Sequence, residues 1–169
     1  GIDRQFSSNI VEALGDGLHV ALCGAGSPLP SPTASGPCVA VIANGELYVV
    51  DVGSNSPRNL GRMGSPVAAL KGVFITHFHS DHIDGLGEIM TLRWAGGDFD
   101  APLPVYGPTG IDRVVAGFNE AYALDFTYRQ AHHGDAVAPL NAAGSQAVSF
   151  IKPPAGETVR LVEKDDLVI

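Results

Sequence analysis

The sequence predicts a single domain of the mixed α/β class (α/β or α+β), with helices layered against a sheet. Three observations support this fold class. Short apolar stretches bounded by Gly, Pro or Asn recur along the chain and are typical of strands. Two longer stretches carry apolar residues at helical spacing. Hydrophobic residues make up 45% of the 169 residues, which is enough for a packed core.

Short apolar stretches predict the strands. They span 18–24, 38–43, 46–51, 72–76, 105–106, 147–151 and 159–162. The second and third of these are joined by Asn44-Gly45, which is a strong signal for a tight hairpin turn. The loop 25–36 contains three prolines, and these exclude a helix or a central strand there.

Helices are expected over 56–63, 86–94 and 109–128, with Thr109 as the N-cap of the last one. Because several strands follow one another with no predicted helix between them, we expect a sheet built mainly from hairpins and not by strict βαβ alternation. No internal repeat or linker divides the chain. We therefore expect one domain over 1–169.

The charge balance is acidic, with 10 Lys and Arg against 18 Asp and Glu and a formal net charge of −8. A nonspecific nucleic-acid binder, or a protein that binds anionic membranes, needs a basic face. No apolar run approaches the roughly 20 residues that a membrane-spanning helix requires. We therefore expect neither nucleic acid nor a membrane as a partner.

Cys23 and Cys38 lie on either side of the Pro-rich loop. They are either two buried thiols, because unpaired Cys is among the most buried residue types, or one disulfide that closes the loop. A disulfide would indicate an oxidising compartment, hence a periplasmic or secreted protein, whereas two thiols would fit the cytoplasm. Neither cysteine belongs to a Cys-x-x-Cys pair, which argues against a zinc knuckle or a thioredoxin-type redox site.

A dense group of metal-binding residue types follows the strand predicted at 72–76. The chain there is His77-Phe-His-Ser-Asp-His82, so three of the six histidines fall within six positions. Clustered imidazoles are costly to bring together unless a cation replaces their hydration. A rigid strand end would let His77 and His79 converge on one ion, while Asp81 and His82 would face a second ion. The sequence therefore predicts a metal site with zinc-type ligands.

These residues resemble the metallo-β-lactamase superfamily. The histidine group preceded by Val73-Phe-Ile-Thr looks like its metal-binding pattern, and Tyr48-Val-Val-Asp-Val-Gly53 is similar to the strand that ends in its buried Asp and Gly. Gly24-Ala-Gly-Ser-Pro-Leu-Pro, together with Ser35-Gly-Pro-Cys38, is most similar to the ribonuclease Z and arylsulfatase-like branch. The resemblance implies an αββα sandwich with a dinuclear metal site where its two sheets meet.

The resemblance also implies roles. His77 and His79 would bind the first ion and Asp81 and His82 the second, with Asp81 as the catalytic carboxylate that orients a metal-activated water. The ions would be two Zn²⁺, with Mn²⁺ or Fe²⁺ as alternatives. We interpret Asp51 as a buried hydrogen-bond acceptor that orients the metal loop, and not as a ligand.

The chain departs from the superfamily after the histidine group. Members complete the site with a third histidine, a bridging Asp in a Gly-Asp-Thr-like turn and a last histidine, but here no such turn and no histidine follows position 133. We therefore expect only the first half of the sandwich, one mixed sheet with flanking helices, truncated at the C-terminus and completed by a complementary segment or chain. His132 and His133 are either an alternative ligand or, as we favour, a helix end or pocket rim, since His and Gly134 suit a helix C-terminus.

The leading hypothesis is a metal-dependent hydrolase that cleaves a small ester-type substrate, whether a carboxylic, sulfate or phosphate ester. The alternative is a non-catalytic metal-binding fragment or assembly subunit that needs a complementary chain, because half a sandwich exposes a sheet edge and an apolar face. A homodimer would cover such a face as well. The acidic charge weighs against RNA processing by this half.

Overall fold

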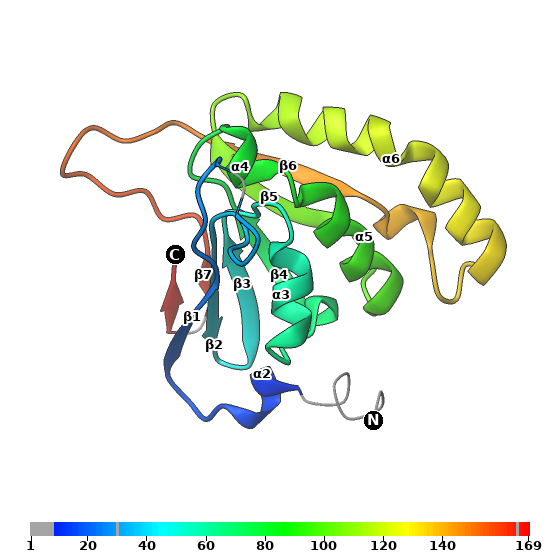
Figure 1. Ribbon diagram of the computed structural model, residues 1–169, viewed down its shortest axis with the longest axis horizontal. Helices are drawn as coiled ribbons and strands as arrows, with labels where there is room; N and C mark the ends of the chain where they lie inside the picture. Colours follow the sequence, from blue (N-terminus) through cyan, green and yellow to red (C-terminus); the bar gives the residue numbers. More distant parts are fainter. Residues whose placement is uncertain (1–8, 30, 165) are drawn as a thin grey trace.

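In the computed structural model, which describes residues 9–29, 31–164 and 166–169, one six-stranded sheet carries its long helices on one side (Figure 1). In their order along the sheet, the strands are β1 (Leu18–Gly24), β2 (Cys38–Ala43), β3 (Glu46–Val50), β4 (Leu70–Phe74), β5 (Leu103–Pro108) and β6 (Ser145–Phe150). The helices are α2 (Ile10–Ala13), α3 (Ser56–Arg62), α4 (Ser80–Ile83), α5 (Leu86–Gly96) and α6 (Ile111–His133), with the 3-10 turns η1 (Val67–Ala69) and η2 (Leu140–Ala142). The predicted fold class, one mixed sheet with flanking helices, is confirmed.

The sheet has an antiparallel half and a parallel half. β1, β2 and β3 pair antiparallel, and the hairpin between β2 and β3 turns at Asn44-Gly45, where both φ angles are positive as the sequence predicts. β3, β4, β5 and β6 pair parallel. The expectation of a mainly hairpin-built sheet is therefore wrong for this half. The helices α3, α5 and α6 each carry the chain back between parallel strands, because such strands need a crossover connection.

The core lies between the sheet and the helices. Trp94 of α5 and Phe126 of α6 meet edge to face at 5.3 Å between ring centroids, so both helices join one buried cluster. The expected N-cap of α6 is wrong, because the helix begins after Gly110, whose φ of +106° makes the turn without a side-chain cap. Among the described residues, none of the helices combines the length and the apolarity that a membrane span needs.

The other face of the sheet is apolar and points away from the helices. At its edge, Leu18, Val20 and Leu22 of β1 are more than 60% exposed. Further along, the rings of Tyr48, Phe74 and Tyr106 form a row across β3, β4 and β5, with centroid distances of 6.1 and 4.6 Å. We call this surface the outward face.

The last described residues form a small separate hairpin. β7 (Glu163–Lys164) pairs antiparallel with β8 (Leu167–Val168). The strand predicted at 159–162 is wrong, since the structure starts the strand at Glu163. Lys164 forms an ion pair with Glu46 of β3, which connects this hairpin to the large sheet.

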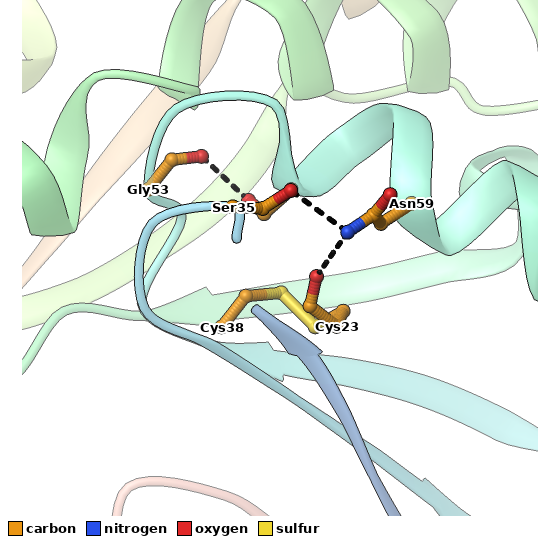
Figure 2. Close-up of a disulfide and its surroundings, with 6 residues drawn as sticks. Cys23, Ser35, Cys38, Gly53 and Asn59 are labelled. Atoms are coloured by element: carbon orange, nitrogen blue, oxygen red, sulfur yellow. Dashed lines mark hydrogen bonds between the residues drawn. A yellow bond between two sulfur atoms is a disulfide. The ribbon is translucent and has the colours of Figure 1, made fainter. Parts of the chain in front are cut away.

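Cys23 and Cys38 form a disulfide between β1 and β2, which decides between the two alternatives left open by the sequence (Figure 2). Both residues are 1% exposed. The Asn59 side-chain amide of α3 donates to the Cys23 carbonyl (3.1 Å) and to the Ser35 hydroxyl (2.8 Å). The disulfide and Asn59 thus fix both ends of the Pro-rich loop. The localisation inferred from this bond stays a prediction.

Candidate metal centre

The candidate site lies where neighbouring parallel strands end. Asp51 follows β3 directly, and Thr76 follows β4 by two residues. The Asp51 N–H donates to the carbonyl oxygen of Phe74 (2.8 Å), so the two segments leave the sheet side by side. The carboxyl ends of parallel strands are where α/β sheets place ligand sites. We call the residues that follow β3, β4 and β5 here, namely 51–53, 75–85 and 109–110, the carboxyl edge.

Asp51 is a buried acceptor under the histidine loop. Its Oδ1 accepts from the Thr76 N–H (2.9 Å), and its Oδ2 accepts from Nδ1 of His82 (2.8 Å). Asp51 is 6% exposed, and its φ of +57° lies in the left-handed region, which Asp tolerates better than most residues. The structure thus gives Asp51 the hydrogen bonds expected of a residue that orients the loop. Its effect on metal binding stays a prediction.

The expected ligands form two donor pairs. In the first pair, Nε2 of His77 lies 3.1 Å from Nδ1 of His79. In the second, Nε2 of His82 lies 3.7 Å from Oδ2 of Asp81. The rings of His77 and His82 are 4.0 Å apart between centroids, so the two pairs are neighbours. The structure therefore brings together all four residues that the sequence singled out.

The chemistry and spacing of each pair suit a divalent ion. Imidazole nitrogens about 2.0–2.1 Å from one tetrahedral zinc lie about 3.3 Å apart, and two ligands at that radius are at most about 4.1 Å apart. Both observed distances agree with these values. Among the described residues, however, no group of three or more such donors meets the geometry of a complete metal site. The four residues thus fit part of a site, and which metal binds, and how many ions, stay predictions.

His132 and His133 are not part of this arrangement. They are exposed in the last turn of α6, which ends at Gly134 with a φ of +77°. The first residues of α6 adjoin the histidine loop, but its 23 residues extend about 35 Å away from it (Figure 1). This placement agrees with the helix-end interpretation.

A close backbone contact supports the loop, and the sequence reasoning missed it. A Cβ at Gly53 would lie 2.5 Å from Cα of Gly36 and closer still to the carbonyl oxygen of Asp81. A Cβ at Gly36 would lie 2.9 Å from the same oxygen. Only glycine fits at these two positions. The sequence contained a signal for this contact, namely Gly36 at the end of the Pro-rich loop and Gly53 shortly after β3.

Comparison with known proteins agrees with the resemblance. Residues 19–98 match the family described as "Anti-Pycsar protein Apyc1". Ribonuclease Z of Mycobacterium avium (strain 104) is 38% identical over 124 residues, and this match covers 72% of the chain and 44% of that protein. Ribonuclease Z of Mycobacterium bovis (strain BCG / Pasteur 1173P2) is 38% identical over 125 residues, with the same coverage. The crystal structure of human tRNase Z, short form, superposes with a TM-score of 0.55 and 27% identity, covering 62% of this chain and 39% of that one.

This chain is a ribonuclease Z-like member of the metallo-β-lactamase superfamily. A metallo-β-lactamase fold protein from Bacillus subtilis superposes over 88% of this chain and 49% of its own, with a TM-score of 0.55 and 18% identity, which supports the fold alone. The ribonuclease Z-like chain spans less than half the length of the relatives it matches. The predicted superfamily is confirmed, whereas the arylsulfatase-like part of the branch stays a prediction.

The expectation that nucleic acid is not a partner is wrong, because the relatives at 38% identity are ribonucleases. That expectation rested on the formal net charge of −8. Net charge averages over a whole surface, whereas phosphate binding depends on the local field at the binding site. The acidic total of this ribonuclease Z-like chain is therefore no evidence against an RNA substrate.

A shallow pocket of about 420 Å³ adjoins the histidine loop. It is lined by Phe78, Thr109, Gly110, Arg113 and Val114. In the sequence Phe78 lies between His77 and His79, and the pocket joins it to the first turns of α6. A larger cavity of about 570 Å³ between α3, η1 and α5 contains none of the expected donors, and we do not assign the site to it.

Proposed function

We propose that this ribonuclease Z-like chain carries part of the metal centre of a hydrolase that cleaves phosphodiester bonds in RNA. The observation that carries the proposal is the meeting of two donor pairs at the carboxyl edge, His77 with His79 and Asp81 with His82. The similarity to ribonuclease Z supports a phosphodiester as the ester type and RNA as the substrate class.

Two Zn²⁺ bound at these pairs would supply Lewis acidity and lower the pKa of a bound water toward neutrality. The residues of the chain would do the rest. His77 and His79 present adjacent ring nitrogens at the exposed edge. Asp81 is 8% exposed, and besides ligating the second ion its carboxylate would orient the attacking water. Asp51 keeps the His82 ring in position through its Nδ1.

A complementary segment or chain would complete the site. Structural zinc takes four ligands and catalytic zinc three plus water, whereas each pair here supplies two. The match covers 44% of the relative, which leaves room for the remaining ligands in the part that is not matched. The outward face exposes apolar side chains along β1, whereas Tyr48 and Phe74 of its aromatic row are only 4% and 8% exposed. We expect a second sheet to pack there, as in a two-sheet sandwich, and a second copy of the chain is the alternative occupant.

The pocket beside Phe78 supports RNA as the substrate. Single-stranded RNA is recognised by stacking of its bases on aromatic rings and by contacts of Arg with its phosphates. Phe78 offers a ring and Arg113 an exposed guanidinium in one pocket that adjoins the donor pairs. The disulfide supports an oxidising compartment, and we propose a periplasmic or secreted location on that ground.

The test measures metal content and RNA cleavage together. The chain is purified alone and mixed with the part of M. avium ribonuclease Z that the match leaves uncovered, and zinc per chain is measured by mass spectrometry. We expect zinc content to rise on mixing and labelled RNA to be cleaved. His79→Ala should lower both by at least about tenfold, because it removes a ligand. His132→Ala, the matched histidine outside the site, should leave both unchanged.

The outcomes separate the two hypotheses. Zinc binding that depends on His79 with no cleavage of RNA in the mixture would favour the non-catalytic metal-binding subunit. Equal zinc content in the wild type, His79→Ala and His132→Ala would overturn the metal centre itself. Formation of a dimer by the chain alone, with no binding of the added segment, would replace the second sheet by a second copy.

A further inference from the structure

Thr76 touches both Asp51 and His77. Its hydroxyl Oγ1 lies 2.8 Å from Oδ2 and 3.0 Å from Oδ1 of Asp51. The same oxygen lies 3.0 Å from Nδ1 of His77. Asp51 also accepts from Nδ1 of His82 at 2.8 Å. One carboxylate is thus linked directly to a histidine of the second donor pair and, through one hydroxyl, to a histidine of the first.

The direction of each hydrogen bond follows from the groups involved. An ionised carboxylate only accepts, and a Thr hydroxyl has a single hydrogen. If that hydrogen pointed at His77, the two short oxygen–oxygen distances between Thr76 and Asp51 would hold no hydrogen bond. The hydroxyl therefore donates to Asp51, and its oxygen accepts from Nδ1–H of His77.

This direction selects the ligand atoms. A proton on Nδ1 of His77 leaves Nε2 with its lone pair, and Nε2 is the atom that lies 3.1 Å from His79. In the same way, Nδ1–H of His82 donates to Asp51, so in the neutral ring the lone pair lies on Nε2, which faces Asp81. Nδ1 protonation therefore leaves the ligating nitrogen available in both rings.

We propose that Thr76 is a positioning residue that transmits the orientation set by Asp51 to His77, so that one carboxylate fixes the tautomer of one ligand in each donor pair. Thr76 serves only the His77 branch, whereas Asp51 serves both. This role of Thr76 rests on the proposed function, because orienting His77 matters only if the two donor pairs bind metal. The tautomers, however, are properties of the metal-free chain.

The test reads imidazole tautomers by two-bond ¹H–¹⁵N correlation NMR on the metal-free chain. The measurement is made at about pH 8, above the ordinary imidazole pKa of about 6.5. We expect His77 and His82 to carry the proton on Nδ1 in the wild type and in Thr76→Ser, which keeps the hydroxyl. Thr76→Val keeps the size and the backbone N–H and removes only the hydroxyl. It should shift His77 toward the Nε2–H form and leave His82 unchanged, whereas Asp51→Asn should disturb both.

The wild type carrying Nε2–H on His77 would overturn the proposal, and so would an unchanged His77 tautomer in Thr76→Val. The His132 signal is the internal reference that no variant should move. Zinc affinity is the second readout, and Thr76→Val should weaken it about tenfold, with Thr76→Ser close to the wild type. Failure of zinc binding in the wild type would overturn the proposed function. The tautomer measurement is independent of that outcome, because it is made on the metal-free chain.

Discussion

Two groups of histidines lie at opposite ends of α6 and have little in common besides their residue type. The group at the carboxyl edge follows a buried strand, and its members reach one another and Asp51 through polar contacts. His132 and His133 follow 21 residues of helix and are exposed. Their rings meet each other at 4.6 Å between centroids. The mere clustering of histidines in the sequence is therefore a weaker indicator of a metal site than the kind of element, buried strand or exposed helix, that precedes the cluster.

The difference has a physical origin. At the carboxyl edge, Asp51 after β3 and Thr76 after β4 converge although they are 25 positions apart in the chain. A buried acceptor such as Asp51 can therefore orient imidazoles. At the end of a helix, the unpaired carbonyls of the last turn and the dipole favour a histidine with no further partner. Variants at the carboxyl edge and in α6 test this difference.

The largest effect is expected for Gly53→Ala. Its Cβ would collide with the backbone of Gly36 and with the carbonyl oxygen of Asp81, and backbone atoms cannot rotate away. We expect a loss of more than about 3 kcal/mol in the free energy of unfolding. The control is Gly117→Ala in α6, where a Cβ meets nothing within 4 Å. That variant should gain about 1 kcal/mol, because Ala is the better helix former.

Urea denaturation followed by circular dichroism measures both changes. Opposite signs for the two variants are the expected result. A Gly53→Ala protein as stable as the wild type would show that the segments carrying Gly36, Gly53 and Asp81 separate easily, and the comparison with α6 would lose its basis.

Local signals made much of the fold predictable, and long-range pairing was the part that they could not supply. Asn44-Gly45 fixed the hairpin of β2 and β3, because its turn conformation is a property of those two residues. The parallel pairing of β4 with β5 joins segments separated by the whole of α5, so no local pattern encodes it. Thr109 was a wrong N-cap because the left-handed Gly110 turns the chain instead.

The candidate site likewise has a part that local sequence predicts and a part that depends on long-range pairing. The four candidate donors from His77 to His82 could be singled out in the sequence, since their spacing is local. The contact of Thr76 with both Asp51 and His77 could not be predicted, because it requires β3 and β4 to be neighbours. The proposed RNA substrate was not anticipated for a related reason, because a net charge does not say where on the surface the charges lie.

After Gly53→Ala, the next largest loss in the free energy of unfolding is expected on removal of the disulfide. Cys23 and Cys38 close a loop with a sequence separation of 15, for which chain entropy predicts about 3 kcal/mol of stabilisation. The double variant Cys23→Ala and Cys38→Ala should lose about that amount in urea denaturation. A reductant should destabilise the wild type similarly and leave the double variant unchanged. A double variant as stable as the wild type would contradict this contribution of the disulfide.

The smallest effect is expected for His132→Ala, at the other end of the comparison. The side chain is exposed, and its favourable interaction with the C-terminal carbonyls of α6 is worth less than about 1 kcal/mol. Added salt should reduce this difference further, because the interaction with the helix dipole is screened. Thermal unfolding at low and at high ionic strength measures it. A loss of several kcal/mol, or a drop in zinc content, would place His132 among the ligands and remove the distinction between the two histidine groups.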